Sequence, residues 1–177
     1  MRSPNVIRSQ GKATRSGEEN LEFVSNISRS ADTILLGRKT YDLLNNYWIN
    51  VKDLPTASMA EIEFSTWYSS ASKLVISNSI KEVKNDKVTI LNKDIIKSIS
   101  KLKQDNGPAI IIFTSPSVTQ LLMEYNLIDI YWLFFNPFFF GKGIRLFKNV
   151  PANINLKFCE TKRFENEELA IKYIRKK

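Results

Sequence analysis

Short apolar runs alternate with helical patterns along the first 125 residues, and this alternation limits the fold more than any other feature. Residues 109–114, AIIIFT, form an unbroken apolar run, and residues 115–126, SPSVTQLLMEYN, follow at once with helical spacing. Strands joined by helices lie parallel to one another through right-handed crossovers and are buried on both faces. The chain is therefore predicted to have an α/β fold with a mostly parallel sheet.

The remaining segments extend this pattern and then change it. Helices are predicted over 18–30, 38–48, 59–71 and 94–107, and strands over 32–37, 73–79 and 87–91. The last third reads as strands joined by turns, which adds antiparallel strands at one edge of the sheet, and Gly141-Lys142-Gly143 is its tightest turn signal. We find no repeat and no linker, so we expect a single domain over residues 1–177.

Composition excludes several classes of protein. No apolar stretch reaches the ~18 residues of a membrane span, and the one cysteine, Cys159, predicts a reducing cytoplasm and no thiolate metal site. The chain has no histidine, so mechanisms based on Ser-His-Asp or Cys-His and histidine-ligated metals are ruled out. If the protein is an enzyme, we expect a bound cofactor to supply its chemistry. The net charge of +8 would suit an anion or a nucleic acid. A nucleic-acid site would also have exposed aromatic residues among its basic ones, and here the aromatic residues cluster in strand-like runs, so we favour an inert basic surface.

Three predicted strands end in polar residues, and in open α/β sheets ligands bind at this edge. The first end is Gly37-Arg38-Lys39-Thr40, which suits a phosphate because it combines a glycine, two cations and a hydroxyl, with Thr40 able to cap the helix. The others are Ser77-Asn78-Ser79 and the stretch Thr114-Ser115-Pro116-Ser117-Val118. Each end also has an ordinary structural explanation: a turn at Ser77, and an N-cap followed by proline at Ser115-Pro116. The sequence leaves open whether they form one anionic-ligand crevice.

The ordered motifs resemble the bacterial dihydrofolate reductase-like family, which includes the reductase domain of riboflavin biosynthesis and small stand-alone members. The similarity lies in ADTILLGRKTYDLL, KLVISNSI and the stretch from IIIFTSPSV to NPFFFGKGIRLF, and it covers roughly residues 20–175. It implies a three-layer dihydrofolate reductase-like fold with a mixed, mostly parallel sheet and a C-terminal antiparallel hairpin.

The resemblance also implies an NADPH-dependent reductase that transfers hydride to a pterin-, pyrimidine- or carbonyl-like substrate. Riboflavin biosynthesis, and with it 5-amino-6-(5-phosphoribosylamino)uracil reductase activity, is one such role. The cofactor-binding residues it implies are Gly37, Arg38, Lys39, Thr40, Ser77, Asn78, Thr114, Ser115, Ser117 and Val118. It names no catalytic residue and no metal site in this chain, and it implies a homodimer.

Two departures from the family pattern support an alternative, a protein that keeps the fold as a ligand-binding or dimeric module without catalysis. Thr114 stands where relatives usually carry glycine, and its side chain would crowd a pyrophosphate. The N-terminal segment offers only a short strand at Asn5–Arg8, and Ser9-Gln10-Gly11 has glutamine where relatives have an acid. Glu18, Glu19 and Glu22 are candidates for a replacement carboxylate, or are simply solvated charges at a helix start.

Overall fold

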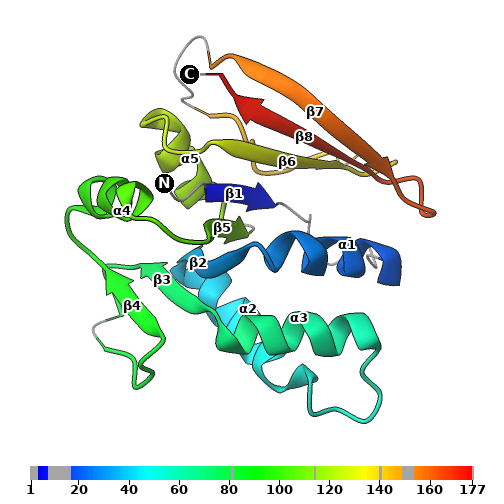
Figure 1. Cartoon of the computed structure of the whole chain (residues 1–177), viewed down its shortest axis with the longest axis horizontal. Helices are drawn as coiled ribbons and strands as arrows, with labels where there is room; N and C mark the ends of the chain where they lie inside the picture. The colour runs from blue at the N-terminus through cyan, green and yellow to red at the C-terminus, as the bar shows by residue number, and fades with distance from the viewer. Residues whose placement is uncertain are drawn as a thin grey trace.

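One sheet runs through the part of the chain described by this computed structural model, which covers residues 4–7, 17–80, 82–113, 115–139, 141–148 and 154–176. The strand order is β4-β3-β2-β5-β1-β6-β8-β7 (Figure 1). The strands from β4 to β6 in this order are parallel, and β8 and β7 complete the sheet as an antiparallel hairpin. The predicted mixed sheet is thus confirmed. The strands are β1 Pro4–Ile7, β2 Ala31–Gly37, β3 Ser72–Ile76, β4 Val88–Leu91, β5 Ala109–Phe113, β6 Ile130–Phe135, β7 Leu156–Arg163 and β8 Leu169–Arg175.

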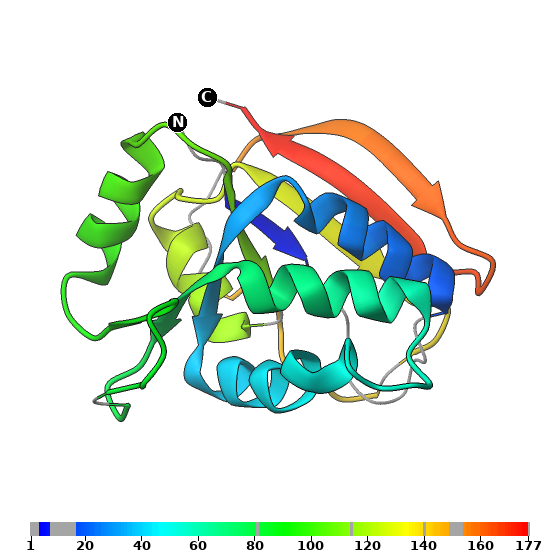
Figure 2. The ribbon, with the colours of Figure 1, turned by 60° about the horizontal axis from the view of Figure 1, so that its bottom comes forward.

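Helices cover both faces of the sheet and give the predicted three layers. Helices α1, α2 and α3 pack against one face, and α4 and α5 pack against the other (Figure 2). Helix α4 ends at Gln104, and the chain leaves it through Gly107, whose φ of 157° suits glycine. The helices are α1 Glu18–Ser28, α2 Arg38–Val51, α3 Met59–Ser70, α4 Ile95–Gln104 and α5 Pro116–Glu124.

The central strands contribute side chains to two separate cores. In β5, Ile111 and Phe113 face the core under α1–α3, while Ile110 and Ile112 face the core under α4 and α5. All four are buried, as are their neighbours in β2. A strand that is covered on both faces needs apolar residues at successive positions, which explains why these runs do not alternate with polar residues.

The predicted turn at Gly141-Lys142-Gly143 is wrong. None of the described residues within 136–148 belongs to a strand, and the hairpin at the end of the chain is β7–β8 instead. Strand β6 already pairs with β1 on one side and β8 on the other, so the segment after it has no open edge beside β6. Gly141 and Gly143 have no positive φ, which a tight two-residue hairpin turn would require.

A buried lysine closes the end of α3. The side chain of Lys73 on β3 is 2% exposed, and its Nζ donates hydrogen bonds to the carbonyl oxygens of Tyr68 (2.6 Å) and Ala71 (3.0 Å). These carbonyls lie at the negative end of the helix dipole, which favours a cation there. Burial lowers the pKa of Lys73 to about 8, and the nearby charge of Lys87 acts in the same direction.

We expect Lys73 to make stability depend on pH. Because its folded pKa of about 8 lies below the ordinary value of 10.5, the unfolded chain binds more protons between these two pH values. The free energy of unfolding contributed by this group therefore rises with pH across that window, by about 2 kcal/mol between pH 7 and pH 10. Urea unfolding of the native chain and of Lys73→Met at both pH values measures the difference. Equal pH dependence in the two proteins would contradict the assignment.

Candidate functional site

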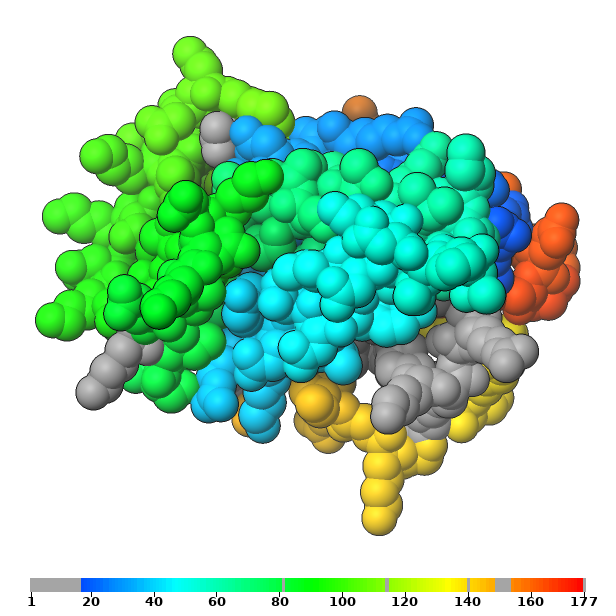
Figure 3. Space-filling model, turned by 90° about the horizontal axis from the view of Figure 1, so that it is seen from below, coloured from blue at the N-terminus to red at the C-terminus, as the bar shows by residue number. Residues whose placement is uncertain are grey.

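The three predicted strand ends are neighbours at one edge of the sheet. Strands β3, β2 and β5 are adjacent and parallel, so their carboxyl ends lie side by side. Helices α2 and α5 begin at this edge, directly after β2 and β5. Figure 3 views the molecule from below, where the start of α2 and the segment after β6 both reach the surface.

A single hydroxyl joins the starts of the two helices. Ser115 is 2% exposed, and its Oγ accepts a hydrogen bond of 2.8 Å from the backbone N–H of Gly37. The same Oγ donates to the hydroxyl of Thr40 at 2.9 Å. Ser115 is the N-cap of α5 and Pro116 its first residue, as predicted, but the Ser115 side chain does not cap its own helix.

Gly37 allows this close approach between β2 and α5. A Cβ atom at Gly37 would lie 3.3 Å from Cγ2 of Val118 and 3.4 Å from Oγ of Ser115, which is tighter than ordinary packing. The sequence suggested that Gly37 lets a phosphate approach the backbone. In the structure its missing side chain makes room for the first turn of α5.

Neither helix start is capped by the side chain of its N-cap residue. Helix α2 begins at Arg38 with Gly37 as N-cap, so the prediction that Thr40 caps it is wrong; Thr40 is the third helical residue and bonds to Ser115. The first-turn N–H groups of a helix carry partial positive charge and bind anions when no side chain occupies them. Two such helix starts therefore lie together at this edge.

Arg38 spans the ends of β2 and β3. Its Nη1 donates to Oγ of Ser79 at 3.0 Å, and its Nε lies 3.5 Å from a carboxylate oxygen of Asp42, one helical turn away. Just over half of the Arg38 side chain remains exposed. The guanidinium thus faces solvent at a fixed position beside the start of α2.

The stretch after β3 combines a turn with exposed polar side chains. The buried hydroxyl of Ser77 accepts hydrogen bonds from the N–H groups of Ser79 (3.2 Å) and Ile80 (3.0 Å), which is the arrangement of a serine turn. Ser77 is therefore occupied within its own turn, whereas Asn78 and Ser79 are exposed. Lys39 and Ser117 are exposed in the first turns of α2 and α5. Thr114, Ser9, Gln10 and Gly11 lie outside the described residues.

A second polar cluster, which sequence reasoning missed, lies farther along the same edge. Asn20 at the start of α1 and Glu168 before β8 are both buried, and the Asn20 amide donates to the Glu168 carboxylate. Burial raises the pKa of Glu168, while hydrogen bonds from Asn166 and Asn20 oppose the rise. The two partners are 148 residues apart, so no local pattern could reveal them.

Glu19, one of the candidate carboxylates, is bound to the same hairpin turn. One of its oxygens lies 2.6 Å from Nζ of Lys162, and the other accepts a hydrogen bond of 2.8 Å from the N–H of Glu165. These contacts, chiefly that with Lys162, lower the pKa of Glu19. Glu18 and Glu22 are exposed, as expected for solvated charges.

The described residues contain no cluster of three or more histidine, cysteine, aspartate or glutamate side chains that could hold a metal ion. Among the same residues, no helix has the length and apolar character needed to cross a membrane. The helix starts, hydroxyls and cations at the sheet edge are suited to an organic anion.

Known proteins with similar sequences and folds agree with this architecture. The uncharacterized protein YyaP of Bacillus subtilis is 31% identical over 144 residues, which are 80% of this chain and 73% of YyaP. A putative riboflavin biosynthesis protein from Shewanella superposes with a TM-score of 0.68 at 18% identity, with both chains fully covered. A dihydrofolate reductase from Enterococcus faecalis, solved with NADP(H), gives a TM-score of 0.62 at 13% identity over 99% of this chain and 97% of its own.

These structural likenesses show that the fold is that of dihydrofolate reductase, as the sequence motifs implied. The family assignment rests on the sequence itself, because residues 7–169 match the family described as the RibD C-terminal domain. The chain therefore belongs to the RibD C-terminal domain family.

Proposed function

We propose that the protein is an NADPH-dependent reductase that transfers hydride to a pterin-, pyrimidine- or carbonyl-like small molecule. The observation that carries the proposal is the junction at Ser115, whose hydroxyl holds the starts of α2 and α5 together at the edge where β2 and β5 end. Membership of a family of NAD(P)H reductases supports it. A role in riboflavin biosynthesis is one form of this proposal.

The residues at the edge fit a dinucleotide phosphate. The first-turn N–H groups of α2 and α5 would hold the pyrophosphate, because two helix dipoles converge there. Arg38, together with Asn78 and Ser79, would hold a further phosphate at the ends of β2 and β3. When bound, NADPH supplies the hydride. The chain itself contributes binding, orientation and exclusion of water rather than a nucleophile.

The alternative, a protein that keeps the fold without catalysis, is favoured by one observation. Both oxygens of Glu19 and the amide of Asn20 are occupied by contacts with the β7–β8 hairpin, at the end of β7 and in the turn. A carboxylate engaged in this way is poorly placed to exchange a proton with a substrate, so the start of α1 offers structural support instead. Cofactor binding and turnover therefore need separate tests.

Cofactor binding is tested by titrating NADPH and following nicotinamide fluorescence. We expect saturation in the micromolar range, and about tenfold weaker binding for Arg38→Met, because a charge-assisted hydrogen bond to phosphate is worth roughly 1.5–3 kcal/mol. Methionine keeps the helix propensity of arginine, so α2 should persist. Arg29→Met, in the helix layer far from this edge, is the matched control and should bind normally. Absence of binding by the native protein would refute the proposal.

Turnover separates the reductase from the alternative. We expect loss of NADPH absorbance with at least one member of a panel of dihydropterins, aminopyrimidines and small carbonyl compounds. At an NADPH concentration about ten times the native dissociation constant, Arg38→Met should turn over at about half the native rate, because its tenfold weaker binding leaves it about half loaded. Tight NADPH binding without oxidation of the cofactor by any substrate on the panel would favour the non-catalytic module.

We also propose that the protein forms a homodimer through one exposed, apolar face of strands β6, β8 and β7, at the end of the sheet. Phe135, Leu169 and Phe158 lie on the same face of β6, β8 and β7, because Phe135 pairs with Leu169 and Phe158 pairs with Tyr173. Their side chains are 51%, 37% and 55% exposed. In the following segment, Phe138 and Phe139 are exposed as well. Apolar patches of this kind usually mark protein interfaces.

Equilibrium sedimentation at tens of micromolar tests the dimer. We expect a dimer for the native chain and a monomer for Phe158→Glu, because a carboxylate in an apolar interface is left without a partner. Lys157→Glu places the same group at the adjacent position of β7, on the opposite face, and should remain dimeric. A native protein that sediments only as a monomer would exclude this interface.

A further inference from the structure

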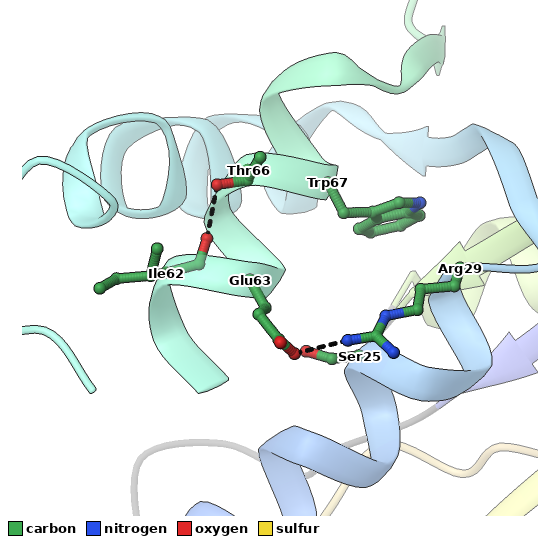
Figure 4. Close-up of a pocket in the computed structure, with 6 residues that line it drawn as sticks. All are labelled: Ser25, Arg29, Ile62, Glu63, Thr66 and Trp67. Atoms are coloured by element: carbon green, nitrogen blue, oxygen red, sulfur yellow. Dashed lines mark hydrogen bonds and ion pairs between the residues drawn. The ribbon is translucent and has the colours of Figure 1, made fainter. Parts of the chain in front are cut away.

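A groove lies between α1 and α3, on the outer side of the helix layer. It has a volume of about 310 Å³ and is lined by Ser25, Arg29, Ile62, Glu63, Thr66 and Trp67 (Figure 4). Ser25 belongs to the C-terminal part of α1, and Arg29 is the C-cap of this helix, which leads into the start of β2. The groove is therefore separate from the edge at which α2 and α5 begin. Its size is at the lower end for a ligand site and suits a one-ring molecule.

The indole of Trp67 gives the groove a fixed aromatic surface. Its Nε1 donates a hydrogen bond of 2.9 Å to the carbonyl oxygen of Ala31, which sets the orientation of the ring. On its inner side the ring packs against Phe64 and Phe113, with centroids 5.4 and 5.8 Å away. The indole is only partly buried, so it can stack against a flat ligand.

The charges of the groove compensate each other. Arg29 and Glu63 form an ion pair of 2.7 Å that links α1 to α3, and both side chains are about half exposed. Because each charge already has its opposite, the groove favours a neutral ligand over an ion. The pair is exposed and contributes little stability, so it can shift as a unit, with its contact intact, when a ligand enters. A guanidinium has five N–H donors, of which the Glu63 contact uses one.

The hydroxyl of Ser25 is the polar group from which we infer a ligand. The residue is 3% exposed, and its Oγ has no hydrogen-bond partner. In Figure 4 this hydroxyl points toward the carboxylate of Glu63. Thr66 differs, because its hydroxyl donates to the carbonyl of Ile62 at 2.7 Å. A buried hydroxyl without a partner is costly, so an acceptor that reaches Ser25 gains a hydrogen bond that nothing in the folded chain provides.

We propose that this groove binds a small, neutral aromatic compound that carries a carbonyl group, such as an aromatic amide. The ring lies against Trp67 and Ile62, and the carbonyl oxygen accepts hydrogen bonds from Ser25 and Arg29. This site is independent of the proposed reductase function, because it shares no residue with the edge at which α2 and α5 begin.

The test is a titration of the full chain with benzamide, followed by NMR on the indole N–H of Trp67 and on the backbone N–H groups. We expect a saturable shift with a dissociation constant of about 1 mM, the range for so small a ligand. Benzoate and benzylamine, which have similar shape but carry a charge, should bind at least fivefold more weakly. Equal binding of all three, no saturation, or shifts confined to Gly37 and Ser115 would overturn the proposal.

Two variants decide the role of Ser25. Ser25→Ala should weaken benzamide binding at least fivefold without lowering the unfolding temperature, because the hydroxyl that it removes has no partner in the folded chain. Thr66→Val is the matched control: it removes a neighbouring hydroxyl that already has a partner, and it should bind benzamide normally. If both variants bind like the native protein, Ser25 does not contact the ligand and the site is not the one proposed.

Discussion

Burial of β5 on both faces is the constraint on which the rest of the structure depends. Its isoleucines enter the two cores alternately, so the strand cannot lie at an edge or face water on either side. It pairs with β2 on one side and β1 on the other, and a helix layer must cover each face. The position of β5 therefore fixes where β2 and β5 end, and hence where α2 and α5 begin. The candidate site is a consequence of this arrangement.

The Ser115 hydroxyl connects this architecture to ligand binding. A serine at an N-cap usually accepts a hydrogen bond from its own helix, which stabilises that helix by about 1 kcal/mol. Here the hydroxyl bonds to Gly37 and Thr40 instead, so it holds the starts of two helices together and does not cap α5. Helix α2 has no side-chain cap because its N-cap residue is Gly37. The same bonds that strengthen the packing thus bring the positive ends of two helix dipoles to one edge of the sheet. Ser115 can therefore have both a structural role, in helix packing, and a role in forming the binding site.

Sequence reasoning reached the elements that depend on local pattern. Apolar runs predicted β2 and β5, and the order of motifs implied the family and the fold. It failed where distant partners decide the outcome. The apolar run after β6 has the sequence pattern of a strand. It cannot pair with β6, because β1 and β8 already occupy the two sides of that strand. Asn20 and Glu168 meet only because the C-terminal hairpin folds back over α1. Thr40 suggested a cap because threonine is common at helix starts, but α2 begins at Arg38 and its N-cap is Gly37.

The two ends of the sheet edge have different chemical character, and this difference frames the question of catalysis. At β2, β3 and β5 the edge presents cations, hydroxyls and helix starts, which suit phosphates. Beside β8 it presents carboxylates, of which Glu19 is held by Lys162 and Glu168 is buried against Asn20. A reductase needs both a cofactor end and a group that manages a proton near the substrate. The groups suited to the cofactor are exposed at the ends of β2 and β3, whereas the carboxylates beside β8 also anchor α1 to the β7–β8 hairpin. Any proton transfer by these groups would therefore require the β7–β8 turn to separate from α1.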